Sequence, residues 1–239
     1  MRGASRQPAR LVLPVLALAA GLVLTACGND TSRTEGSKIA LDVAKSVKAR
    51  LVARKKGPGP APDPEALAST AMASFPGPLI MVGMEKSGVV SAMGEYGRNG
   101  ANLTYASPAQ QTMTFRGGLL VATRGLGHDL MSAELGSAAT LIAQRAEGEY
   151  QRANRYLDGE GLERPLPMTC SLKRGGSEQF AFAGTTYATE ILNETCRSTG
   201  LTVTNAYWVT RDGTIARSRQ WIGPALGYAG IQLVRGESH

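Results

Sequence analysis

The sequence predicts a mainly β fold: an antiparallel sheet, either barrel-like or a sandwich, preceded by an amphipathic helix and a proline-rich spacer. Short runs of strand-forming residues, separated by glycine-containing turns, follow one another between residues 79 and 235. Strands and helices do not alternate regularly, so a parallel nucleotide-binding sheet is not expected. The chain has 239 residues, 43% of them hydrophobic, which suffices for one substantial domain. These patterns do not separate a barrel from a sandwich.

An export signal precedes the domain. Residues 1–10 are basic, and residues 11–24 form an apolar run that is too short to cross a bilayer as a helix. Residues 24–27 (LTAC) resemble the bacterial lipobox, which implies cleavage after Ala26 and acylation of Cys27. Several acyl chains on one residue hold a protein on a membrane far more firmly than a single chain does. The alternatives are an ordinary secretory signal with an incidental cysteine, or a buried helix.

The residue after Cys27 indicates where the anchored protein resides. It is Gly28, whereas an aspartate at this position commonly retains lipoproteins in the inner membrane. We therefore expect a lipid-anchored protein on the periplasmic face of the outer membrane. The predicted organisation is a lipoprotein signal peptide at residues 1–26, a lipid-anchored tether at 27–64 and a β-rich periplasmic domain at 65–239.

The tether contains a basic amphipathic helix and a stiff spacer. Residues 37–56 place isoleucine, valine and leucine at intervals of four among many lysines and arginines. This helix either lies on anionic lipid headgroups beside the acyl anchor or docks its apolar stripe on the domain. Alternate prolines at residues 57–64 end the helix and favour an extended, semi-rigid spacer.

The domain is predicted to open with a short helix at residues 64–75 and to continue with strands. Glycine-containing tetrapeptides at residues 174–177 and 211–214 indicate tight hairpin turns. Residues 131–147 are ambiguous, because their spacing of alanine and leucine permits a helix. Strands are predicted at residues 79–85, 89–96, 102–106, 112–116, 119–123, 150–157, 166–173, 178–182, 186–192, 201–210, 214–221 and 231–235.

The distribution of charge argues against a nucleic-acid-binding protein. The formal net charge is +7, but the excess lies in the first 56 residues, and residues 57–239 are close to neutral. A protein that binds DNA or RNA carries its positive charge on the folded surface that meets the phosphates. No nucleic acid is therefore expected as a partner.

The three cysteines fit an exported protein. With Cys27 acylated, Cys170 and Cys196 remain as a pair that can form a disulfide in the oxidising periplasm. Two unpaired buried thiols are the alternative. Neither of these cysteines belongs to a CxxC motif, and the chain has only two histidines, so no metal site or cofactor is expected.

Two motifs carry a family resemblance. Residues 117–130 (GGLLVATRGLGHDL) run from a strand into a turn, and residues 217–228 (RSRQWIGPALGY) contain a Gln-Trp pair and end in a Gly-aromatic pair. Together with the lipobox and the β-rich body, these motifs resemble the YjbF/GfcB family of bacterial lipoproteins, which is encoded with exopolysaccharide and group 4 capsule genes. The resemblance implies a non-enzymatic accessory role in polysaccharide production or export at the outer membrane. It offers no catalytic residue to carry over.

Five side chains in these motifs are candidates for contact with polysaccharide or with export proteins of the outer membrane: Arg124, Asp129, Arg219, Trp221 and Tyr228. Aromatic faces can stack on sugar rings, and arginines bind the carboxylates or phosphates of an acidic polymer. The alternative interpretation is structural. A tryptophan in an alternating strand then belongs to the core, and Arg124 pairs with Asp129 within its own turn.

Common catalytic motifs are absent from the sequence. It contains no GxSxG, GxGxxG or GxxxxGK[ST] pattern, and His128 with Asp129 is interpreted as a surface turn rather than a metal site. Because two carboxylates suffice for a glycosidase, a polysaccharide-modifying hydrolase or lyase built on Asp129, Glu134, Glu160 or Glu190 is an alternative. A third hypothesis is an envelope-structural module that binds anionic lipid through its basic helix.

Overall fold

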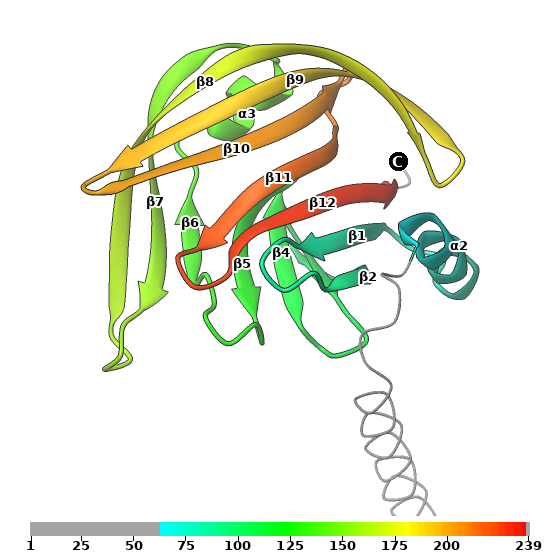
Figure 1. Ribbon diagram of the computed structural model, residues 1–239, viewed down its shortest axis with the longest axis horizontal. Helices are drawn as coiled ribbons and strands as arrows, with labels where there is room; N and C mark the ends of the chain where they lie inside the picture. Colours follow the sequence, from blue (N-terminus) through cyan, green and yellow to red (C-terminus); the bar gives the residue numbers. More distant parts are fainter. Residues whose placement is uncertain (1–62, 238–239) are drawn as a thin grey trace, which may run out of the picture. The chain divides into compact units, whose positions relative to one another are not determined.

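Twelve strands make up one antiparallel sheet in the computed structural model, which describes residues 63–237. Their spatial order is β5-β4-β3-β2-β1-β12-β11-β10-β9-β8-β7-β6 (Figure 1). The elements, in chain order, are α2 (Pro64–Ser74), β1 (Leu79–Met84), β2 (Val90–Asn99), β3 (Asn102–Ala106), β4 (Thr112–Arg116), β5 (Leu119–Arg124), β6 (Ser132–Glu134), α3 (Ala138–Ala143), β7 (Gly148–Leu157), β8 (Glu163–Phe182), β9 (Thr185–Ser198), β10 (Leu201–Thr210), β11 (Ile215–Gly223) and β12 (Gly227–Arg235).

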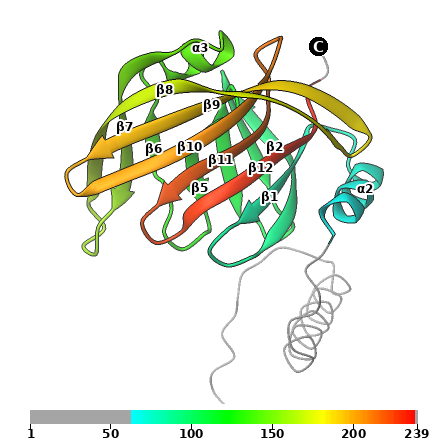
Figure 2. The same cartoon turned by 45° about the horizontal axis from the view of Figure 1, so that its top comes forward.

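The sheet curls on itself, so that its two outer strands approach each other and the barrel is nearly closed (Figures 1 and 2). In the connection between β5 and β6, the amide of Thr123 donates to the carbonyl of Leu130 at 2.9 Å. The first and last strands pair in the middle of the sheet, where Val82 faces Ile231. The mainly β, antiparallel fold expected from the sequence is confirmed, and of its two forms the barrel-like one is present.

Alternating side chains fill the interior of the barrel. In β10, every second residue from Val203 to Val209 is buried, as the two-residue period of a strand requires. The buried positions are mostly aliphatic and aromatic, but polar residues such as Asn205 and Glu194 are also enclosed. Helix α3 lies at one end of the barrel and adds Ala138 and Ile142 to the interior (Figure 2).

Helix α2 packs on the outer side of the sheet. It begins at a local signal, because the Asp63 side chain accepts a hydrogen bond from the amide of Glu65 at 3.1 Å and Pro64 occupies the first turn. Ala68 is fully buried in an apolar cluster that also contains Met81 of β1. The helix is therefore fixed by packing on the barrel as well as by its cap.

The distal part of the β8–β9 hairpin, residues 179–188, extends beyond the flanking strands and is called the arm (Figure 1). It is fastened to the outer face of the sheet through Arg217 of β11, whose guanidinium carbon lies 4.1 Å from the ring centroid of Phe180 and 4.4 Å from that of Trp208. Near its tip, the amide of Ala183 donates to a carboxylate oxygen of Glu65 in α2 at 3.0 Å. The arm thus connects β11 with α2.

One predicted turn is wrong. Strand β8 runs through residues 174–177 without a break, and the pair of glycines there forms a bulge between Arg174 and Gly176. The hairpin turn lies instead at Ala183 and Gly184, both of which have positive φ. The ambiguous segment 131–147 contains both the short strand β6 and helix α3.

The expected disulfide is present. Cys170 of β8 and Cys196 of β9 face each other across the two strands and are bonded, with 0% and 1% of their surface exposed. The predicted acylation site Cys27, the helix predicted at residues 37–56 and nearly all of the predicted spacer lie outside the described residues. No helix within residues 63–237 combines the length and the hydrophobicity that crossing a membrane requires.

Candidate functional site

The turns β5–β6, β7–β8 and β11–β12 lie at the same end of the barrel (Figure 1). Residues of these turns line a pocket of about 560 Å³. Both sequence motifs contribute to it, the first through His128 and Asp129 and the second through Gly223. Its volume is within the usual range for sites that bind small molecules. The pocket, here called the motif pocket, is lined by Gly127, His128, Asp129, Met131, Tyr156, Leu157, Asp158, Gly223, Pro224 and Ala225.

The first wall of the motif pocket is a loop organised by one carboxylate. Asp129 accepts hydrogen bonds from the hydroxyl of Thr123 at 2.8 Å and from the amides of Gly125 at 2.9 Å and Leu126 at 3.1 Å. Gly125 has a φ of 80°, in the left-handed region that glycine adopts without strain. The Asp129 side chain therefore holds the loop in one conformation.

The second wall, the β7–β8 turn, is organised in the same way. Asp158 accepts from the amides of Glu160 at 3.0 Å and Leu162 at 2.9 Å, and from Nε of Arg164 at 2.7 Å. The hydrogen bonds from Leu162 and Arg164 lower the pKa of Asp158 below its ordinary value. The carboxylate is thus ionised at neutral pH and fixed in position.

The third wall is the β11–β12 turn, and packing against Tyr156 requires a glycine at the last residue of β11, Gly223. A Cβ atom at Gly223 would lie 2.9 Å from Cε1 of Tyr156, too close for an alanine unless the ring moves. The Tyr156 hydroxyl donates to the carbonyl of Ile222 at 2.6 Å, and its ring packs edge-to-face on Trp221 with centroids 6.2 Å apart. Burial raises the pKa of Tyr156 to about 12, so the phenol stays protonated. Nζ of Lys86, in the β1–β2 turn, donates to the carbonyl of Ala225 in the β11–β12 turn at 2.8 Å.

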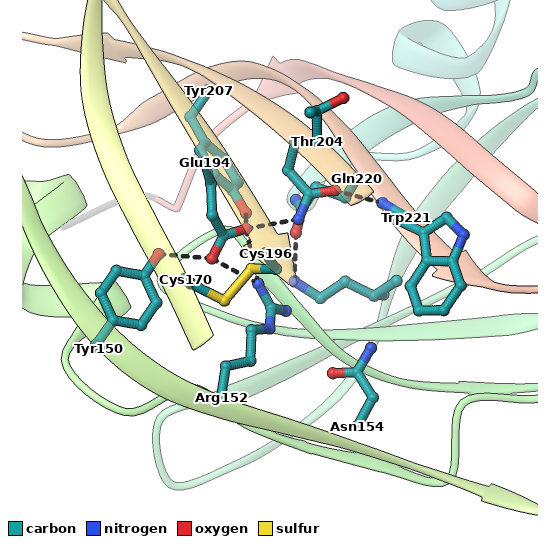
Figure 3. A network of polar contacts seen from close by, with 12 residues as sticks. Tyr150, Arg152, Asn154, Cys170, Glu194, Cys196, Thr204, Tyr207, Gln220 and Trp221 are labelled. Atoms are coloured by element: carbon teal, nitrogen blue, oxygen red, sulfur yellow. Dashed lines mark hydrogen bonds and ion pairs between the residues drawn. A yellow bond between two sulfur atoms is a disulfide. The ribbon is translucent and has the colours of Figure 1, made fainter. Parts of the chain in front are cut away.

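A buried polar network occupies the barrel interior (Figure 3). The carboxylate of Glu194 is fully buried and accepts hydrogen bonds from Arg152 at 3.0 Å on both oxygens, from Tyr150 and Asn205 at 2.5 Å, and from Tyr207 at 2.8 Å. Burial alone would raise the pKa of Glu194, but the charge of Arg152 and these hydrogen bonds outweigh it and lower the pKa. The network therefore holds an ionised carboxylate beside the disulfide.

The arginines of the second motif lie on the outer face of the barrel. Arg219 donates from Nε and Nη2 to the carboxylate of Glu85 at 2.6 and 2.8 Å, and its guanidinium carbon lies 3.5 Å from the centroid of the Tyr228 ring. Arg217 donates to Glu178 at 2.6 Å while lying between the arm and the sheet. Both guanidinium groups are thus occupied by partners within the chain.

The family model for YjbF, described as the group 4 capsule polysaccharide lipoprotein GfcB, matches residues 43–234. The chain belongs to this family. Its fold is similar to the crystal structure of the hypothetical lipoprotein YmcC from Escherichia coli K12, with a TM-score of 0.63 and 15% identity over 72% of this chain and 91% of that one. At this identity the likeness concerns the fold alone.

A Bacteroides fragilis protein, described as exported and YmcC-like in fold, also matches, with a TM-score of 0.27 and 12% identity over 66% of this chain and 94% of that one. This score is too low to carry an argument. None of the curated proteins matches the chain. Because the YjbF family and YmcC are described as lipoproteins, they imply a place in the cell envelope.

The five contact residues predicted for this YjbF-family chain do not come together in one place. Arg219 and Tyr228 are neighbours on the outer face. Trp221 is 7% exposed and packs on Tyr156, so it belongs to the core, as the structural alternative expected. Asp129 lines the motif pocket, whereas Arg124 donates to the carbonyls of Thr123, Leu130 and Met131. No ion pair between Arg124 and Asp129 is found within residues 63–237.

The motif pocket also contains residues that sequence reasoning missed. Tyr156, Leu157 and Asp158 come from the β7–β8 region, far from either motif in the chain. The sequence Asp-Gly-Glu-Gly from residue 158 is a turn signal that could have marked this loop. Its position beside the Asp129 loop follows from the pairing of β6 with β7, in which Ser132 faces Arg155.

The four carboxylates considered for a glycosidase lie in different elements of the barrel. Glu134 pairs with Arg155 at 2.6 Å, and Glu190 with Arg174 at 2.9 Å. Asp129 organises its loop, and Glu160 lies in the turn organised by Asp158. Asp129, Glu134 and Glu190 thus have structural partners within the chain.

Proposed function

We propose that this chain is a lipid-anchored protein on the periplasmic face of the outer membrane that assists the production or export of a capsule-type polysaccharide without catalysing a reaction. The observation that carries the proposal is the match of residues 43–234 to the YjbF family of capsule polysaccharide lipoproteins. Its partners are the membrane, through the N-terminal lipid, and polysaccharide or outer-membrane export proteins.

The compartment is supported by two features, one before the domain and one within it. The lipobox at residues 24–27 supplies an acylation site at Cys27, and Gly28 favours sorting to the outer membrane. In the domain, the bonded pair Cys170 and Cys196 is a feature of proteins that fold in an oxidising compartment such as the periplasm.

A role in binding rather than catalysis is supported by the two carboxylates that line the motif pocket. A glycosidase general acid needs a carboxyl whose pKa is raised by an apolar setting. The pKa of Asp158 is lowered instead, and the oxygens of Asp129 accept hydrogen bonds from its own loop. Both carboxylates therefore behave as fixed acceptors.

Deletion of the gene tests the proposal. Surface polysaccharide should fall in the deletion strain and should return when the full chain is supplied from a plasmid. Unchanged polysaccharide after deletion would contradict a role in the pathway. Purified full chain incubated with the extracted polymer should leave its length and composition unaltered. Release of a product would overturn the non-enzymatic part of the proposal.

A further inference from the structure

The motif pocket is formed before any ligand arrives. Each of its three loops is held by a side chain: Asp129 holds the first from within, Asp158 holds the second from within, and Lys86 of the β1–β2 turn donates to the third. A ligand that enters such a site does not have to order the loops, so less of its binding free energy is lost. The pocket is thus suited to recognition of a weakly interacting molecule.

The polar groups left over in the motif pocket are mainly hydrogen-bond acceptors. An ionised carboxylate offers about four acceptor positions. Asp129 and Asp158 each use three of them within their loops, which leaves about one on each. The exposed imidazole of His128 makes no hydrogen bond within the described part of the chain, and it can both donate and accept. These groups match the hydroxyls of a sugar.

The remainder of the lining is apolar. Met131, Leu157, Pro224 and the ring of Tyr156 contribute carbon surface, and Leu157 is 51% exposed although it is a large hydrophobic residue. Exposed apolar surface beside a few fixed polar groups is typical of small-molecule sites. A pyranose ring presents the same combination, with C–H groups on its faces and hydroxyls at its edge.

The charged residues that line the motif pocket indicate which saccharides it can bind. The residues that line the pocket within the described chain include two aspartates and neither lysine nor arginine. Arg164 of the β7–β8 turn is paired with Asp158, and Lys86 donates to the carbonyl of Ala225. A uronic acid or a phosphorylated sugar would meet negative charge without an available positive partner.

We propose that the motif pocket binds an uncharged saccharide unit, a neutral hexose or N-acetylhexosamine residue of a polymer. This assignment rests on the proposed function in polysaccharide handling and names the ligand class of the site. Acidic units of the polymer, where it has them, lie outside the pocket.

Calorimetric titration of the purified full chain in detergent tests the assignment. The probes are the neutral oligosaccharides maltohexaose, cellohexaose and N-acetylchitohexaose, with hexagalacturonate as the acidic comparison. At least one neutral probe should bind, and hexagalacturonate should bind more weakly or not at all. His128→Ala and Leu157→Ser should each raise the Kd for that probe about tenfold, through the loss of a hydrogen bond and of apolar contact.

Leu162→Ser is the matched control. Leu162 is 52% exposed on the same β7–β8 turn but does not line the pocket, so its replacement should leave the Kd unchanged. Failure of every neutral probe to bind, preference for hexagalacturonate, or an equal effect of Leu157→Ser and Leu162→Ser would each overturn the assignment. The gene deletion separates this result from the proposed function, because loss of surface polysaccharide would support the pathway role even if no neutral sugar bound.

Discussion

Glu194 shows how a single charged residue is accommodated inside the barrel. Its carboxylate is 0% exposed, and the guanidinium of Arg152 is its counter-charge. A buried charge without a partner is very unfavourable, whereas an exposed ion pair contributes little. We therefore expect Arg152, which lies inside the barrel, to contribute more to the free energy of unfolding than Arg155, which lies outside on the same strand.

Replacing Arg152 with methionine should lower the free energy of unfolding by about 3–5 kcal/mol, because Glu194 then remains buried without its counter-charge. Urea denaturation of the full chain measures the loss. Arg155→Met on the same strand is the control. Arg155 pairs with the exposed carboxylates of Glu134 and Glu163, so this change should cost no more than about 1 kcal/mol. Equal losses in the two variants would show that the interior pair has no special role.

Glu194 also predicts how stability responds to acid. Its pKa is lower in the folded protein than the ordinary value of 4.5, so on acidification the unfolded chain takes up a proton first. The stability contributed by Glu194 is present above about pH 4.5 and is lost as the pH falls through the folded pKa. The Glu194→Gln variant should therefore lose stability less steeply below this pH. Urea midpoints measured from pH 7 to pH 3 give both slopes, and identical slopes would contradict the prediction.

At the scale of elements, strands with regular alternation could be predicted from the sequence, and β8 could not. The bounds expected for residues 102–106, 112–116 and 201–210 agree with β3, β4 and β10. In β8, Gly176 has a φ of 107°, a conformation that glycine supplies equally to a tight turn and to a bulge. Contacts between distant segments decide between the turn and the bulge, because Phe180 packs on Arg217 and the arm contacts α2.

The disulfide joins the two longest strands, and its removal should be costly. Replacing Cys170 and Cys196 together with alanine should lower the free energy of unfolding by about 2–5 kcal/mol, a typical range for a native disulfide. Because both sulfur atoms are buried, the folded protein should resist dithiothreitol and become reducible only in urea. Alkylation followed by mass spectrometry checks both states. Rapid labelling of the folded protein after mild reduction would contradict the burial.

For the whole molecule, the sequence could predict the class of fold and the family, but not the site. The lipobox, the two motifs and the run of strands are local signals, and the family match and the β fold follow from them. The motif pocket depends on tertiary structure, because the pairing of β6 with β7 places Asp129 near Asp158, and the curling of the sheet brings Gly223 of β11 to them. The same closure encloses Trp221, whose side chain had been a candidate for sugar stacking.

The role of the motif pocket in handling the polymer is tested most directly in a strain whose only copy of the chain carries His128→Ala and Leu157→Ser. The quantity to measure is the amount of surface polysaccharide. A strain with Leu162→Ser alone is the control, and immunoblotting establishes equal protein levels. The double variant should lower surface polysaccharide to nearly the amount found after gene deletion, and the control should keep the wild-type amount. Wild-type polysaccharide in the double variant, in a background where deletion removes it, would contradict a role for the motif pocket in handling the polymer.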